Sequence, residues 1–92
     1  MNNKVEVTPH PAVHEDGRRV HDGLFVILVD GEQMGLVWKR PAHHIHFFQR
    51  VEQHVVDEVQ QQVVQLMGEQ RPISWAPDLS QLDDETLEKL LA

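Results

Sequence analysis

The residues best suited to chemistry are three neighbouring histidines, His43, His44 and His46. On an extended segment His44 and His46 would point to the same side, whereas on a helix His43 and His46 would share a face. Imidazole nitrogens bind zinc, copper or nickel, and a closed structural zinc site needs four ligands. The cluster therefore gives a zinc-binding hypothesis, with a solvated histidine cluster as its alternative. Further ligands would come from a second chain or from the remaining histidines, His10, His14, His21 and His54.

Nucleophilic catalysis has little support in the sequence. The chain has no cysteine, and its two serines, Ser74 and Ser80, lie outside any G-x-S-x-G motif. The acidic run at residues 83–85 is explained by capping of a helix. We therefore expect a protein that is not an enzyme and that has no cofactor, apart from the zinc alternative.

The charge of the chain is unevenly distributed. Fifteen acidic residues against eight basic ones give a net charge of −7. Residues 52–92 contain nine of the acids, but only Arg71 and Lys89 among the bases. Because duplex-binding proteins neutralise phosphates with lysine and arginine, nucleic acid is not expected as a partner. The acidic half either keeps the chain soluble or faces a partner with a basic surface.

Two apolar runs flank a turn signal in the first half of the chain. Residues 24–29 and 34–38 are apolar, and Asp30-Gly31 lies between them. This pattern predicts a β-hairpin over residues 24–38 with a two-residue turn. In the expected register Val29 faces Glu32 and Ile27 faces Met34. Both faces of the hairpin are apolar at its centre, so each face needs a cover.

The middle of the chain has the periodicity of a helix. Between Pro41 and Met67 there is no further proline and no glycine, and Gly68 is a stop signal. This segment predicts one amphipathic helix over residues 42–67, with glutamines such as Gln60 and Gln61 on its polar face. Residues 43–67 would span about 37 Å as a helix. The apolar residues that recur at three- and four-residue steps are Phe48, Val51, Val55, Val59, Val63 and Leu66.

The remaining sequence completes a single α+β domain over residues 1–92. Residues 1–40 are expected to be rich in strands, and residues 69–81 to form a loop. A short C-terminal helix is predicted over residues 83–91, with Asp83 as its N-cap. We expect a small antiparallel sheet, centred on the hairpin, that packs against the long helix.

These elements expose more apolar surface than a chain of this length can cover, which predicts a homodimer. The alternative is a monomer whose C-terminal helix folds over the second face of the sheet. Either way, the chain is expected to be a non-enzymatic protein–protein interaction module, such as a regulator, inhibitor or adaptor. Its partners would be a second copy and another protein with a basic surface. The residues expected to contact a partner are Trp75, Leu79, Leu87, Leu90 and Trp38.

The other functional hypothesis is a protein that binds a metal or a small ligand through His43, His44 and His46. No apolar run is long enough to span a membrane, and the first residues lack the apolar region of a secretory signal. A cytoplasmic location without membrane contact is therefore expected.

Overall fold

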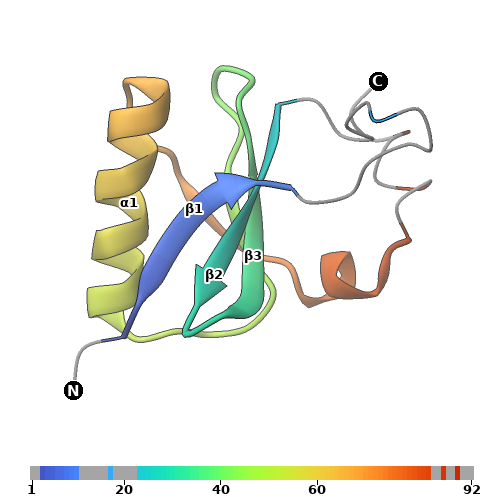
Figure 1. The fold of residues 1–92 in the computed structure, drawn as a ribbon, viewed down its shortest axis with the longest axis horizontal. Helices are drawn as coiled ribbons and strands as arrows, with labels where there is room; N and C mark the ends of the chain where they lie inside the picture. Colours follow the sequence, from blue (N-terminus) through green and yellow to red (C-terminus); the bar gives the residue numbers. More distant parts are fainter. Residues whose placement is uncertain (1–2, 11–16, 18–22, 84–85, 87–88, 90–92) are drawn as a thin grey trace.

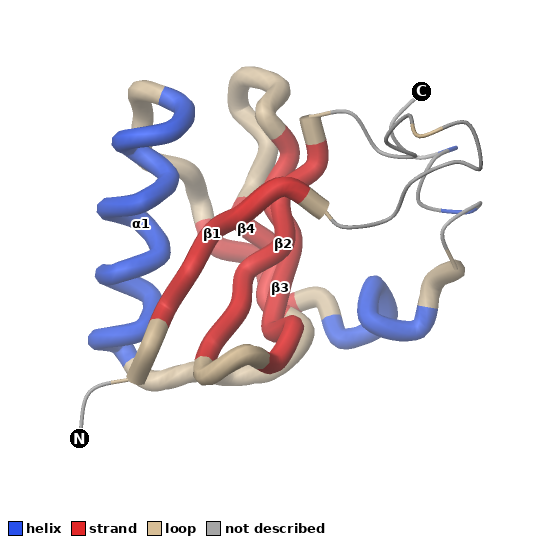
Figure 2. The backbone as a smooth tube through the Cα atoms, viewed as in Figure 1, coloured by secondary structure: helices blue, strands red, loops and turns tan. Residues whose placement is uncertain are grey.

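The computed structural model describes residues 3–10, 17, 23–83, 86 and 89. In this part of the chain the strands form one five-stranded sheet, and a single α-helix lies on one side of it (Figures 1 and 2). This arrangement confirms the predicted α+β class. The elements in chain order are β1 (Val5–Pro9), β2 (Leu24–Val29), β3 (Glu32–Trp38), β4 (Ile45–Phe47), α1 (Gln53–Met67), β5 (Ile73–Trp75) and a 3-10 helix, η1 (Pro77–Gln81).

The five strands follow one another across the sheet in chain order. The pairs from β1 to β4 are antiparallel, and β5 adds parallel to β4. Strands β1 and β5 are therefore the two edges of the sheet. Figure 1 shows α1 on one side of the sheet and η1 on the other.

The hairpin turn between β2 and β3 is the one that the sequence predicts. Asp30 and Gly31 both have positive φ, 53° and 85°, as a two-residue type I′ turn requires. The Asp30 carboxylate accepts a hydrogen bond from the Lys4 N–H at 2.9 Å and another from the Asn3 Nδ2 at 2.7 Å. These bonds stabilise the ionised form, and they lower the pKa of Asp30 from its usual value.

The predicted register of the hairpin is correct for the two pairs next to the turn, Val29 with Glu32 and Leu28 with Gln33, and wrong from Ile27 onward. Val29 faces Glu32 as expected, but Ile27 faces Gly35 instead of Met34, because β3 carries a bulge at this point. One extra residue in a strand exchanges the faces of every residue that follows it. Leu36 and Trp38 consequently lie on the opposite face of the sheet from Ile27.

Each face of the sheet has its own apolar core. The core on the second face includes Leu24 and Trp38, and Leu82 from the C-terminal part of the chain packs against it. The expectation that both faces need a cover is thus confirmed, and part of the second cover comes from the same chain. The core between the sheet and α1 consists of Ile27, Val37, Ile45, Phe47, Val55, Val56, Val59 and Val63.

The predicted helix over residues 42–67 is wrong at its start and correct at its end. Ala42 has a positive φ of 66°, which a right-handed helix cannot contain, and residues 45–47 form β4. A three-residue strand is too short for its alternation to stand out from the helical pattern around it. At its end, α1 is followed by Gly68 in the left-handed conformation, as predicted. The fifteen residues of α1 span about 22 Å, so its length no longer argues for a second chain.

The predicted loop over residues 69–81 is also incorrect, because it contains β5 and η1. Residues 73–75 form a strand because they pair in parallel with β4, and no local sequence pattern predicts this pairing. The predicted helix over residues 83–91 lies largely outside the described residues. Its N-cap bond is present, since the Asp83 carboxylate accepts the Thr86 N–H at 2.8 Å. No helix in the described ranges is long and apolar enough to cross a membrane.

Candidate interaction site

A glutamine of α1 covers the outer edge of β1. The Val7 N–H donates to Gln62 Oε1 at 2.9 Å, and Gln62 Nε2 donates to the Val5 carbonyl at 2.6 Å. The side-chain amide thus takes the place of a neighbouring strand, which we call the Gln62 bridge. The next outward residue, Pro9, has no N–H to offer. This edge of the sheet is therefore closed to a further strand.

A second glutamine binds both backbone groups of a single residue, Arg71, just before β5. Gln60 Nε2 donates to the Arg71 carbonyl at 2.5 Å, and the Arg71 N–H donates to Gln60 Oε1 at 3.1 Å. We call this pair of bonds the Gln60 bridge. The helical spacing predicts Gln60 on the polar face of the helix, and nothing in that spacing distinguishes Gln60 from Gln61. The two bridges depend on tertiary placement of the amides, which explains why the pattern missed them.

The outer edge of β5 is open beyond the Gln60 bridge. On the inner side, the Ile45 N–H donates to the Pro72 carbonyl at 2.8 Å, and the Ala76 N–H donates to the Phe47 carbonyl at 2.7 Å. Because peptide groups alternate in direction along a strand, those of Ile73 and Trp75 face outward. Within the described residues they have no hydrogen-bond partner. Two adjacent outward positions of the sheet are thus available for pairing.

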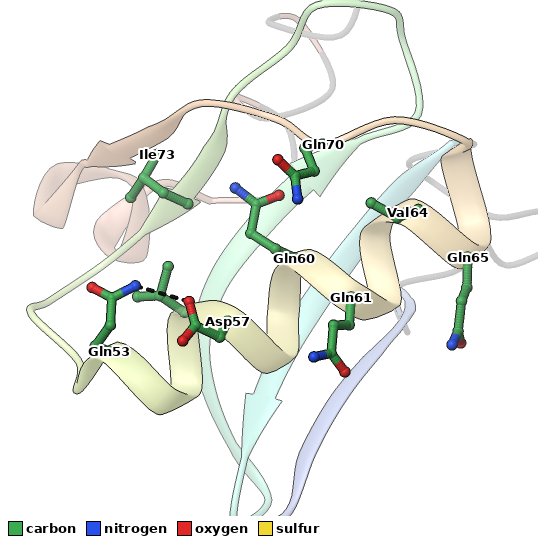
Figure 3. Close-up of a pocket in the computed structure, with 9 residues that line it drawn as sticks. Gln53, Asp57, Gln60, Gln61, Val64, Gln65, Gln70 and Ile73 are labelled. Carbon is green, nitrogen blue, oxygen red and sulfur yellow. Dashed lines mark hydrogen bonds between the residues drawn. The ribbon is translucent and has the colours of Figure 1, made fainter.

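A groove of about 900 Å³ lies between this part of the chain and the exposed side of α1 (Figure 3). Among the described residues that line it, Asp57 alone is charged, and the Asp57 carboxylate accepts a hydrogen bond from Gln53 Nε2 at 2.9 Å. The groove therefore combines neutral amides, a few apolar side chains and a single negative charge. Its lining residues are Gln53, Val56, Asp57, Gln60, Gln61, Val64, Gln65, Gln70 and Ile73.

Trp75 lies at the end of the open edge and remains 37% exposed. Its ring packs against Phe47 with 5.5 Å between the ring centroids. The Arg50 guanidinium lies 4.4 Å from the centre of the Trp75 ring, which is a cation–π contact. Trp75 is thus held in a defined position while part of its surface stays accessible, as a partner-contacting residue requires.

The other residues expected at a partner surface are located differently. Leu79 is half-buried on η1, and Trp38 is only 5% exposed in the core on the second face of the sheet. Leu87 and Leu90 lie outside the described residues. Of the three described members of this set, Trp75 alone lies beside the open edge.

The three histidines do not converge on a metal position. His46 lies on β4 against Trp38, with 5.5 Å between the ring centroids, and the His44 ring lies 6.2 Å from that of His46. Burial lowers the pKa of His46, and the neighbouring charges of His44 and His43 lower it further. Among the described residues, no group of three or more side chains could hold a metal ion. The zinc-binding hypothesis gains no support from this geometry.

Arg71 is a buried residue whose role the sequence analysis missed. It is 3% exposed, and its Nη1 donates to the Trp38 carbonyl at 2.9 Å and to the His43 carbonyl at 3.1 Å. Its Nε lies 3.1 Å from the Glu69 carboxylate. Arg71 thereby connects the segment before β5 to the loop between β3 and β4. Together with the Gln60 bridge, it fixes the position at which the open edge begins.

Comparison with known proteins gives no relative for this chain. No family model matches it, and neither the curated proteins nor the solved structures contain a significant match.

Proposed function

We propose that the chain is a non-enzymatic protein–protein interaction module that binds an extended segment of another protein at the outer edge of β5. The observation that carries this proposal is the pair of outward peptide groups at Ile73 and Trp75, which lie open beside a groove. Added strands bind by main-chain hydrogen bonds, and pockets for alternate side chains give them specificity.

The contrast between the two edges of the sheet supports this function. Exposed strand edges invite unwanted pairing, and natural proteins close them or keep them short. Here the Gln62 bridge closes the β1 edge, whereas the Gln60 bridge ends at Arg71, and no described residue pairs with the next two outward positions. The open part of the β5 edge adjoins a groove and the exposed Trp75. A binding function would explain why this part of the edge is not closed.

The test compares two variants of one edge residue. Proline at position 73 removes the outward N–H without removing a bond to β4, whereas Ile73→Ala shortens the side chain and keeps the N–H. Peptides are selected on the wild-type protein from a random ten-residue display library, then synthesised and measured by fluorescence anisotropy. We expect Ile73→Pro to bind them about tenfold more weakly than Ile73→Ala, since it loses one main-chain bond and obstructs its neighbour.

Equal binding by Ile73→Pro and Ile73→Ala would place the peptide elsewhere and contradict the proposal. Circular dichroism verifies that both variants fold. If Ile73→Pro does not fold, hydrogen exchange of the wild-type Ile73 and Trp75 amides decides the question, because a bound strand must slow the exchange of both. Failure of the library to yield any peptide that protects these amides would also contradict the proposal.

A further inference from the structure

The pleat of β5 determines where the side chains of an added strand would point. Ile73 and Trp75 are paired with Ile45 and Phe47, whose side chains belong to the core beneath α1. Side chains of neighbouring strands continue on the same face, so every second residue of an added strand lies on the α1 side. On that side, the groove along α1 is the surface that those residues meet.

The groove favours positively charged side chains over negatively charged ones. Of the lining residues that the structure describes, five are glutamines, which are neutral and can both donate and accept hydrogen bonds, and one is charged, the Asp57 carboxylate. A lysine or arginine that reaches the groove would therefore meet an opposite charge and a glutamate a like one, whereas a residue beside Trp75 would meet the Arg50 guanidinium. The net charge of −7 adds a general attraction for basic segments that decreases with salt.

A second copy of the chain fits this edge poorly. Strand β5 has three residues between Pro72 and Pro77, so two copies could pair along only that short stretch. Such pairing would also bring together two protein halves that are both strongly acidic. The acidity of a second copy and the charge of the groove both favour a foreign basic segment.

We infer that the partner is an extended basic peptide segment, which adds to the outer edge of β5 and places a lysine or arginine opposite Asp57 in the groove; this inference rests on the proposed function.

The experiment uses three synthetic ten-residue peptides in which valine alternates with lysine, with glutamine or with glutamate. Binding to the full chain is measured by fluorescence anisotropy at low and at physiological salt, and hydrogen exchange reports the Ile73 and Trp75 amides. We expect the lysine peptide to bind tightest and to protect both amides. The glutamate peptide should bind most weakly.

Two variants with equal loss of charge separate a local contact from the general field of the protein. Asp57→Asn removes the carboxylate in the groove, and Glu58→Gln removes the next carboxylate along α1, which lies outside the groove lining. We expect Asp57→Asn to reduce the preference for lysine over glutamine about two- to fivefold, as an exposed ion pair does. Glu58→Gln should leave this preference nearly unchanged.

The outcomes distinguish this inference from the function on which it rests. Equal effects of Asp57→Asn and Glu58→Gln would overturn the inference, since the preference would then come from net charge alone. Equal binding of the lysine and glutamine peptides, with both amides protected, would overturn the inference and support the proposed function. Protection of these amides by self-association, seen as a dimer in sedimentation, would overturn the inference in favour of a second copy. If none of the three peptides protects the amides but a peptide selected from the random library does, the inference fails and the proposed function stands. If no library peptide protects them either, both fail.

Discussion

Three consecutive glutamines on α1 allow the value of an amide bridge to be measured within one helix. The Gln62 side chain makes two hydrogen bonds to β1, whereas the Gln61 side chain is exposed and makes no hydrogen bond within the described part of the chain. Gln62→Ala and Gln61→Ala therefore remove the same side chain and gain the same helix propensity. Only Gln62→Ala leaves the Val7 N–H and the Val5 carbonyl without their partner.

The expected effect follows from the two bonds. Each intramolecular hydrogen bond contributes about 0.5–1.5 kcal/mol net, so Gln62→Ala should lower the free energy of unfolding by about 1–3 kcal/mol relative to Gln61→Ala. A chain of this size has a free energy of unfolding of roughly 5–14 kcal/mol, and the loss is therefore measurable. The melting temperature should fall by about 4–8 °C for each kcal/mol.

Urea denaturation followed by circular dichroism gives the free energies, and hydrogen exchange gives the protection of the Val7 amide. We expect Gln62→Ala to expose this amide to exchange and to leave the amides of β3 protected. If Gln61→Ala and Gln62→Ala lose the same free energy, the bridge contributes nothing to stability. That result would refute the view that a side-chain amide closes the β1 edge.

Three further outcomes are expected from single residues. Arg71→Ala should lower the free energy of unfolding by about 3 kcal/mol or more in urea denaturation, because two carbonyl groups lose a charged donor, and Arg71→Lys should recover only part of this loss. Gly35→Ala should cost more than about 2 kcal/mol, because its Cβ would lie 2.5 Å from the backbone oxygen of His46. Gly31→Ala, at a φ of 85° with no atom within 4 Å, should cost only about 1 kcal/mol, and equal losses would contradict this difference. Folding lowers the pKa of His46, because burial favours its neutral form. The contribution of the neutral imidazole to the free energy of unfolding is therefore present above about pH 6.5, and it is lost as the pH falls below that value. His46→Phe should therefore reduce the dependence of unfolding free energy on pH between about 7 and 5.5, and an unchanged dependence would contradict the lowered pKa.

The sequence predicts the parts of the fold that depend on neighbouring residues. The turn at Asp30-Gly31 and the end of α1 at Gly68 each require a positive φ, and residue type reports that requirement directly. The parts that depend on distant contacts were missed. The bulge in β3 and the parallel pairing of β4 with β5 leave no periodic signal, and they decide which apolar residues share a face.

The candidate site shows the same division. Trp75 is among the residues that the sequence predicts at a partner surface, and in the structure it lies beside the open edge. Gln60 and Gln62 look like ordinary polar residues of a helix, and their bridges exist only because the helix crosses the sheet between its two edges. Which strand edge is open depends on the strand order of the whole sheet, so it cannot be predicted from any single segment of the sequence.

The two bridges also fix how α1 is turned about its own axis. Gln60 and Gln62 are two residues apart, so they leave the helix about 200° apart, and each binds backbone at a different edge of the sheet. The buried residues of α1 are all valines. Because valines are short and identical in shape, their packing does little to fix the rotation of the helix about its axis. A rotation of the helix that shortened the hydrogen bonds of one bridge would lengthen those of the other. The orientation of α1 is therefore set by polar contacts at its two flanks, and the valines stabilise its packing on the sheet.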